Sequence, residues 1–142
     1  MAESVPAVRR GGTHLFVYGS LVDPRCLDAV LGYRFDGERL RARLADYERI
    51  VSDGFDYPFI VPSAGGLVEG ILVMDLTADD LGILDRYEEV QSGFYSRASV
   101  DIEAWGCGPR SVFVAAQVYV AGSALQRLRA SSAAQTTRST AI

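Results

Sequence analysis

Segments of extended type outnumber helical segments along this chain, and that ratio most constrains its fold. Short apolar or alternating runs, which are typical of β-strands, are mostly joined by short connections. They occupy residues 14–18, 39–44, 57–62, 67–76, 95–102 and 111–120. Helical patterns are confined to residues 24–31, 77–90 and 123–130. We therefore expect the α+β class, as a small mixed, mostly antiparallel β-barrel flanked by short helices.

Local signals indicate where several of these elements begin and end. Residues 67–76 form the strongest strand pattern, and Gly70 within it indicates a bulge or a close backbone approach. Ser63–Gly66, just before that strand, predicts a turn. Thr77 caps the predicted 77–90 helix, with an acidic residue three positions later as in a capping box. The first helix is delimited by the cap residues Asp23, Pro24 and Gly32.

Length and composition predict one globular domain. The chain has 142 residues, of which 49% are hydrophobic and 23% charged. We expect a flexible tail at 1–13, the domain at 14–122, and a short helix with a disordered tail at 123–142. A formal net charge of -4 without a basic run argues against nucleic-acid binding. No apolar stretch of about 18 residues occurs, so we expect no membrane association. The sequence leaves the oligomeric state open.

Cysteines and histidine are scarce, which argues against several kinds of site. The chain has two cysteines, Cys26 and Cys107, and one histidine, His14. Neither a CxxC nor an HExxH pattern is present, so we expect no metal site. Two cysteines do not make a disulfide scaffold, which favours a reducing, cytoplasmic location. We interpret both cysteines as buried packing residues and His14 as structural.

The first candidate site is the junction Tyr18-Gly19-Ser20-Leu21. A buried strand that stops at Gly-Ser before a helix leaves backbone N–H groups unpaired and pointing together. Such a group of amides binds a small anion, either a carboxylate or a phosphate, and the Ser20 hydroxyl adds a donor. The alternative is a plain strand-to-helix turn in which Gly19 supplies only backbone freedom.

The second candidate is Glu88. At about 100° per residue, a 77–90 helix would place Glu88 between Leu81 and Leu84 on its apolar face. A carboxylate directed at a core is uncommon unless it is paired or functional, and burial raises its pKa toward the range useful for proton transfer. The alternative is a frayed helix end, with Glu88 in water or paired to Arg97 or Arg86.

Two tyrosines on strand faces form the third candidate group. Tyr95 opens one predicted strand and Tyr119 lies near the end of another. Their hydroxyls could orient a ligand. The alternative is that both are core residues with a phenol that reaches the surface.

Read in order, these segments resemble the gamma-glutamylcyclotransferase-like family. The resemblance runs from about Leu15 to Val120, and the Tyr-Gly-Ser-Leu and Leu-Asp-x-Tyr-Glu segments carry most of its specificity. The matching segments are Phe16–Leu21, Tyr57–Ile60, Val68–Leu72, Leu84–Glu88 and Gly93–Arg97. Members of that family have a small mixed barrel flanked by helices. Many of them release 5-oxoproline from a gamma-glutamyl amine or amide, without a cofactor.

The resemblance also implies roles for the candidate residues. The loop of Tyr18, Gly19, Ser20 and Leu21 would hold the substrate's α-carboxylate. Glu88 matches the family's catalytic glutamate, acting as general acid/base, and Tyr95 and Tyr119 match positions that often line the pocket. The residue after the glutamate is often glycine in the family, whereas here it is Glu89. That extra carboxylate would either raise the pKa of Glu88 further or disfavour an acidic leaving portion.

The partner implied by the resemblance is a small gamma-glutamyl molecule whose leaving amine the sequence does not specify. Two other readings of the same pocket stay open. The domain could bind a small molecule without turnover, or it could be an amidohydrolase or acyl-transfer enzyme. Cyclisation releases 5-oxoproline, whereas hydrolysis releases glutamate, so product analysis separates these readings.

Overall fold

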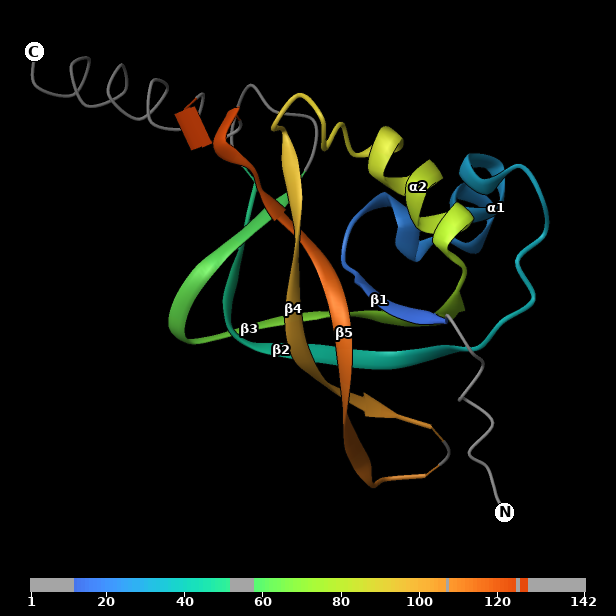
Figure 1. The fold of residues 1–142 in the computed structure, drawn as a ribbon. Helices are drawn as coiled ribbons and strands as arrows, with labels where there is room; N and C mark the ends of the chain where they lie inside the picture. Colours follow the sequence, from blue (N-terminus) through green and yellow to red (C-terminus); the bar gives the residue numbers. More distant parts are fainter. Residues whose placement is uncertain (1–11, 52–57, 107, 125, 128–142) are drawn as a thin grey trace, which may run out of the picture.

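A computed structural model describes residues 12–51, 58–106, 108–124 and 126–127, and it shows a closed β-barrel with helices at one side (Figure 1). The strands follow one another around the barrel in the order β1-β3-β2-β4-β5. Their bounds are β1 Thr13–Val17, β2 Arg39–Ile50, β3 Phe59–Leu76, β4 Tyr95–Trp105 and β5 Ser111–Ala121. The helical elements are the 3-10 turn η2 Ser20–Val22, α1 Pro24–Leu31 and α2 Ala78–Tyr87.

Strand pairing confirms the expected mixed, mostly antiparallel sheet. Strand β3 pairs antiparallel with both β1 and β2, and β4 pairs antiparallel with β2 and β5. The ring closes through a short parallel contact between β1 and β5, at Leu15 with Gln117 and Phe16 with Val118. Because a closed barrel has no free sheet edge, each strand is paired on both sides.

The turn predicted at Ser63–Gly66 is wrong, because this segment lies within one long strand. Residues 59–62 and 67–73 of β3 both pair with β2, and the segment between them lies opposite Asp46 alone. Asp46 adopts a left-handed φ of 64°, and its carboxylate accepts the Gly65 N–H at 3.0 Å. The glycines here allow β3 to bulge without reversing its direction. A residue composition that is typical of turns therefore forms an irregularity within a strand.

Alternating residues along the strands divide the buried side chains into two layers. One layer has members from all five strands, and its largest side chains include Phe16, Ile60 and Leu72. The other layer, which includes Leu15 and Val17 of β1, packs against the helices. Gly70 lies beside the end of β1, next to the pair Val17 and Ile71, and a Cβ there would overlap the Val17 carbonyl oxygen. The expected close backbone approach at Gly70 is therefore confirmed.

Both helices have the predicted N-caps. The Asp23 carboxylate accepts the Arg25 N–H, and Gly32 ends α1 with a left-handed φ of 85°. Thr77 and Asp80 form a complete capping box at the start of α2. The predicted C-terminus of the second helix is wrong, since α2 ends at Tyr87 rather than at Val90.

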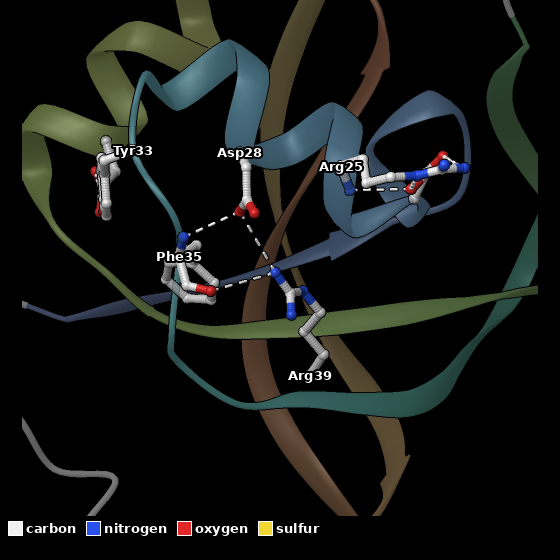
Figure 2. Close-up of polar contacts among 7 residues, drawn as sticks. Arg25, Asp28, Tyr33, Phe35 and Arg39 are labelled. Atoms are coloured by element: carbon white, nitrogen blue, oxygen red, sulfur yellow. Dashed lines mark hydrogen bonds and ion pairs between the residues drawn. The ribbon is translucent and has the colours of Figure 1, made fainter.

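A polar network holds α1 against the barrel (Figure 2). The Asp28 carboxylate accepts the Phe35 N–H at 2.9 Å and lies 3.7 Å from the Arg39 guanidinium. Tyr33 donates its hydroxyl proton to the buried Asp80 carboxylate at 2.8 Å, which ties the same connection to α2. These contacts join the segment after α1 to both α2 and the start of β2, and so fix the η2–α1 unit on the barrel.

The predicted tails lie mostly outside the described residues. Thr13, which we assigned to the N-terminal tail, belongs to β1. Residues 123–124 and 126–127 are helical, as expected for the start of the C-terminal segment. Among the described residues, no helix is both long and apolar enough to cross a bilayer.

Candidate active site

A cavity of about 160 Å³ opens at the end of β1, beside the C-terminus of α2. Its size suits a small molecule. All of the predicted site residues line it, namely Tyr18, Gly19, Ser20, Leu21, Glu88, Tyr95 and Tyr119. These residues come from the connection between β1 and η2, from η2 itself, from the end of α2, and from β4 and β5, so the barrel and the helices each contribute part of the wall.

The loop after β1 forms one wall of the cavity. The Gly19 and Ser20 carbonyl oxygens accept the N–H groups of Val22 and Asp23, which closes the 3-10 turn. Within the described part of the chain, the N–H groups of residues 19–21 donate to no backbone carbonyl. The first amides of a helical turn have no partner within it, so they are available to an anion. A Cβ at Gly19 would lie 3.2 Å from the Pro58 ring, so glycine also permits this close approach.

Glu88 lines the cavity from the end of α2, and not from within a helix that continues to Val90. It is the C-cap of α2, and its N–H donates to the Leu84 carbonyl oxygen at 2.8 Å. The helix stops here because the next residue, Glu89, has a left-handed φ of 55°. The prediction that the helix continues past Glu88 is therefore wrong, whereas the expected burial of its carboxyl is borne out, and Glu88 lines the cavity.

Burial raises the pKa of the Glu88 carboxyl from 4.5 to about 7. No positive side chain in the described residues offsets this, because the Arg97 guanidinium binds Asp85 at 2.9 Å. Glu89, which also lines the cavity, is exposed and is not a cause of the shift. The suggestion that Glu89 raises the pKa of Glu88 further is thus unsupported. Near neutral pH the Glu88 carboxyl can therefore both accept and donate a proton.

Among the described residues, four tyrosines line the cavity, and three of them, Tyr18, Tyr95 and Tyr119, use their hydroxyl protons within the protein. Tyr18 donates to the Tyr119 carbonyl oxygen at 2.6 Å, and Tyr95 donates to the Pro58 carbonyl oxygen at 2.7 Å. The Tyr119 hydroxyl donates to the Asp85 carboxylate at 2.6 Å. Burial raises the pKa of Tyr18 and of Tyr119, so both stay protonated. A ligand would meet mainly their rings, which agrees with the reading of Tyr95 and Tyr119 as core residues.

Sequence reasoning assigned no role to two residues of this region. Tyr87 lines the cavity, and its hydroxyl lies 3.0 Å from the Ser20 Oγ. The Asp85 carboxylate accepts a hydrogen bond from the Tyr119 hydroxyl and forms an ion pair with the Arg97 guanidinium. Both residues belong to the Leu-Asp-x-Tyr-Glu segment, so their presence in that motif was the available signal.

The remaining candidates lie outside the cavity. Cys26 is half-buried against the helix-side layer, as expected of a packing residue, whereas Cys107 lies outside the described residues. The His14 Nδ1 accepts the Asp75 N–H at 3.1 Å, in keeping with a structural role. No cluster of three or more potential metal ligands occurs among the residues that the structure describes.

Comparisons with solved structures place the chain among known folds. A solution structure from Arabidopsis thaliana is 31% identical and aligns with a TM-score of 0.69, over 82% of this chain and 72% of the other. A structure titled gamma-glutamyl cyclotransferase is 19% identical and aligns with a TM-score of 0.63, over 78% of this chain and 66% of the other. At that identity the second match supports the fold alone.

Comparison with sequences and a family model identifies the family. AIG2-like protein C of Arabidopsis thaliana is 35% identical over 88 residues, which is 62% of this chain and 48% of that protein. The chain thus matches only about half the length of such curated relatives. The family model described as gamma-glutamyl cyclotransferase, AIG2-like, matches residues 15–137. That match covers most of the chain, which therefore belongs to the AIG2-like gamma-glutamyl cyclotransferase family.

Proposed function

We propose that this protein is a gamma-glutamyl cyclotransferase that releases 5-oxoproline from a gamma-glutamyl amine or amide. The observation that carries the proposal is one small cavity lined both by Glu88, whose carboxyl has its pKa raised to about 7, and by Gly19, Ser20 and Leu21 of the loop. Family membership supports the reaction class. The geometry supports Glu88 as the acid/base and the loop as the anchor.

The reaction joins two parts of one substrate molecule. The Glu88 carboxylate takes a proton from the substrate's α-ammonium group, which makes that nitrogen a nucleophile. The amine attacks the side-chain carbonyl carbon, and the new C–N bond closes a five-membered ring. Protonated Glu88 then donates its proton to the departing nitrogen, and the old C–N bond breaks. The ring nitrogen still carries one extra proton, which the Glu88 carboxylate takes up and passes to the released amine. The products are 5-oxoproline and the free amine. Acid/base catalysis of this kind contributes roughly 10²–10⁴-fold.

Anchoring makes the ring closure efficient. The substrate's α-carboxylate would accept hydrogen bonds from the loop amides and from the Ser20 hydroxyl. A carboxylate fixed at one end favours the curled conformation in which amine and carbonyl meet. The aromatic walls, Phe16, Phe94 and Tyr95 among them, limit water around the reacting atoms.

The leaving amine would lie toward the open side of the cavity. Glu88 and Glu89 are the charged side chains among the described residues that line it, and both are acidic. A second carboxylate near the leaving group would repel a negative charge. We therefore expect substrates whose leaving portion is neutral or positive.

The test is 5-oxoproline release from gamma-glutamyl amines, amides and dipeptides by the wild type, Glu88→Gln and Glu69→Gln. Glu69 is an exposed glutamate on β3 that does not line the cavity, so it controls for the chemical change itself. We expect turnover by the wild type and by Glu69→Gln, and a loss of at least about 10²-fold in kcat for Glu88→Gln. Equal turnover by all three proteins would exclude Glu88 as the acid/base.

The same assay distinguishes the other readings of the pocket. Release of glutamate in place of 5-oxoproline would identify an amidohydrolase, because water and not the α-amine would then be the nucleophile. Binding of 5-oxoproline or glutamate without any product from the panel would identify a binding module.

A further inference from the structure

The hydroxyl groups of Ser20 and Tyr87 meet at the edge of the cavity. Their oxygens are 3.0 Å apart, and both residues line the cavity. Ser20 is the first residue of η2, whereas Tyr87 is the last residue of α2, so the contact joins elements 67 residues apart in the chain. Ser20 follows Gly19 of the anchor loop, and Tyr87 precedes Glu88. The bond therefore links the loop that would hold the substrate to the helix end that carries the acid.

Either oxygen of this pair can be the donor, and the direction matters. A hydroxyl has one proton to donate and two lone pairs to accept with. If Ser20 donates to Tyr87, its only proton is used within the protein. If Tyr87 donates to Ser20, the serine proton is free to point into the cavity. The second arrangement forms a chain of two hydrogen bonds, and each bond polarises the next when the final acceptor is charged.

We propose that Tyr87 is a positioning residue that donates its hydroxyl proton to Ser20 and thereby directs the Ser20 hydroxyl at the substrate's α-carboxylate. This inference rests on the proposed function, since it assigns the carboxylate to the loop. Among the described residues, the Cys26 Sγ also lies within hydrogen-bond range of the Tyr87 hydroxyl, at 4.0 Å, and sulfur is a weaker acceptor than oxygen. A phenol is a stronger hydrogen-bond donor and a weaker acceptor than an aliphatic hydroxyl, which favours Tyr87 as the donor and Ser20 as the acceptor.

The two successive hydrogen bonds, from Tyr87 to Ser20 and from Ser20 to the ligand, should affect binding of the carboxylate more than proton transfer by Glu88. Loss of the Tyr87 hydroxyl leaves Ser20 free to rotate, so the serine pays an ordering cost when it binds the ligand. Loss of one neutral hydrogen bond weakens binding by roughly 3–10-fold, and loss of one to a charged group weakens it more. The acid and the loop amides stay in place, so kcat should change little.

The experiment measures equilibrium binding of 5-oxoproline and of its amide, which lacks the carboxylate charge, to four proteins. These are the wild type, Tyr87→Phe, Ser20→Ala and the double variant. We expect Tyr87→Phe to bind 5-oxoproline about 3–10-fold more weakly and to bind the amide as the wild type does. In the Ser20→Ala background, the Tyr87→Phe change should have no further effect.

Turnover and a matched control complete the test. With a substrate that the wild type converts, Tyr87→Phe should raise KM by a similar factor and leave kcat within about twofold. Tyr33→Phe is the control, because it removes a phenol that donates to Asp80 away from the cavity. A merely structural Tyr87 would lower Tm and leave the preference for 5-oxoproline over its amide unchanged.

Three outcomes overturn the inference. In the first, Tyr87→Phe weakens the binding of 5-oxoproline and of its amide equally. In the second, Tyr87→Phe weakens the binding of 5-oxoproline as much in the Ser20→Ala background as in the wild type. In the third, the wild type does not bind 5-oxoproline. The proposed function fails in a different way. A wild type that binds 5-oxoproline but releases none from any substrate would contradict the enzyme assignment, while the four-protein comparison would still measure the role of Tyr87.

Discussion

Replacing Glu88 by glutamine should stabilise the protein at alkaline pH while abolishing turnover. Burial raises the pKa of this carboxyl from 4.5 to about 7, so the folded protein binds the proton more tightly than the unfolded chain does. Stability from Glu88 is therefore fully present below pH 4.5 and is lost as the pH rises toward 7. Above pH 7 the wild type holds a charged carboxylate in a partly buried site, and the neutral glutamine avoids that cost.

The size of the effect follows from the pKa change. Each unit of pKa corresponds to about 1.4 kcal/mol, so the rise from 4.5 to about 7 sets an upper limit of about 3 kcal/mol. Glu88 keeps some solvent access, which reduces the expected difference to about 1–3 kcal/mol. For a protein near this size, a difference of 1 kcal/mol changes Tm by roughly 2–4 °C.

Urea unfolding of the wild type and Glu88→Gln at several pH values between 4 and 9 measures this directly. The free energies of unfolding should differ by a near-constant small amount below pH 4.5, diverge as the pH rises, and reach a constant gap above about pH 7.5 in favour of the variant. Parallel pH profiles for the two proteins would refute the reasoning, since they would mean that burial does not perturb the Glu88 carboxyl.

Further predictions concern the rate and the backbone. The kcat/KM of the wild type should rise with pH through about 7 and then level off, because Glu88 must be ionised to accept the first proton. Glu89→Gly should raise the free energy of unfolding by about 0.5–1 kcal/mol in thermal or urea unfolding, since it removes a left-handed non-glycine residue. Glu89→Gln should improve kcat/KM for leaving groups that carry a carboxylate by on the order of fivefold relative to neutral ones, and the gain should shrink in high salt. Gly70→Ala should lower the free energy of unfolding by about 1–3 kcal/mol, because its Cβ would overlap the Val17 carbonyl oxygen.

Local signals predicted much of the fold because they act over a few residues. The caps at Asp23, Gly32 and Thr77 were read correctly, since a cap needs only the residues within one helical turn. The close approach at Gly70 was also predicted from a glycine within a strand pattern. The turn at Ser63–Gly66 was not correctly predicted, because the pairing of β3 with the far half of β2 continues past it.

In the candidate site, too, the residue types were predicted from the sequence, whereas part of their placement was not. The segments around Gly19 and Glu88 were picked out as residue types suited to an anion and to proton transfer. The sequence placed Glu88 within a helix that runs to Val90, whereas α2 ends at Tyr87 and Glu88 is its C-cap. That difference arises because Glu89 adopts a left-handed conformation, which residue type alone does not indicate for a glutamate.

What the sequence alone determined was the set of local elements, the mixed β class and the residues with useful chemistry, because each depends on neighbours along the chain. Only the tertiary structure decided that a loop near residue 20 and a helix end near residue 88 share one cavity. It also decided that the tyrosine hydroxyls are used within the protein and that Tyr87 meets Ser20. Closure of the barrel brings these distant segments together, and burial in that closed structure is what moves the pKa of Glu88.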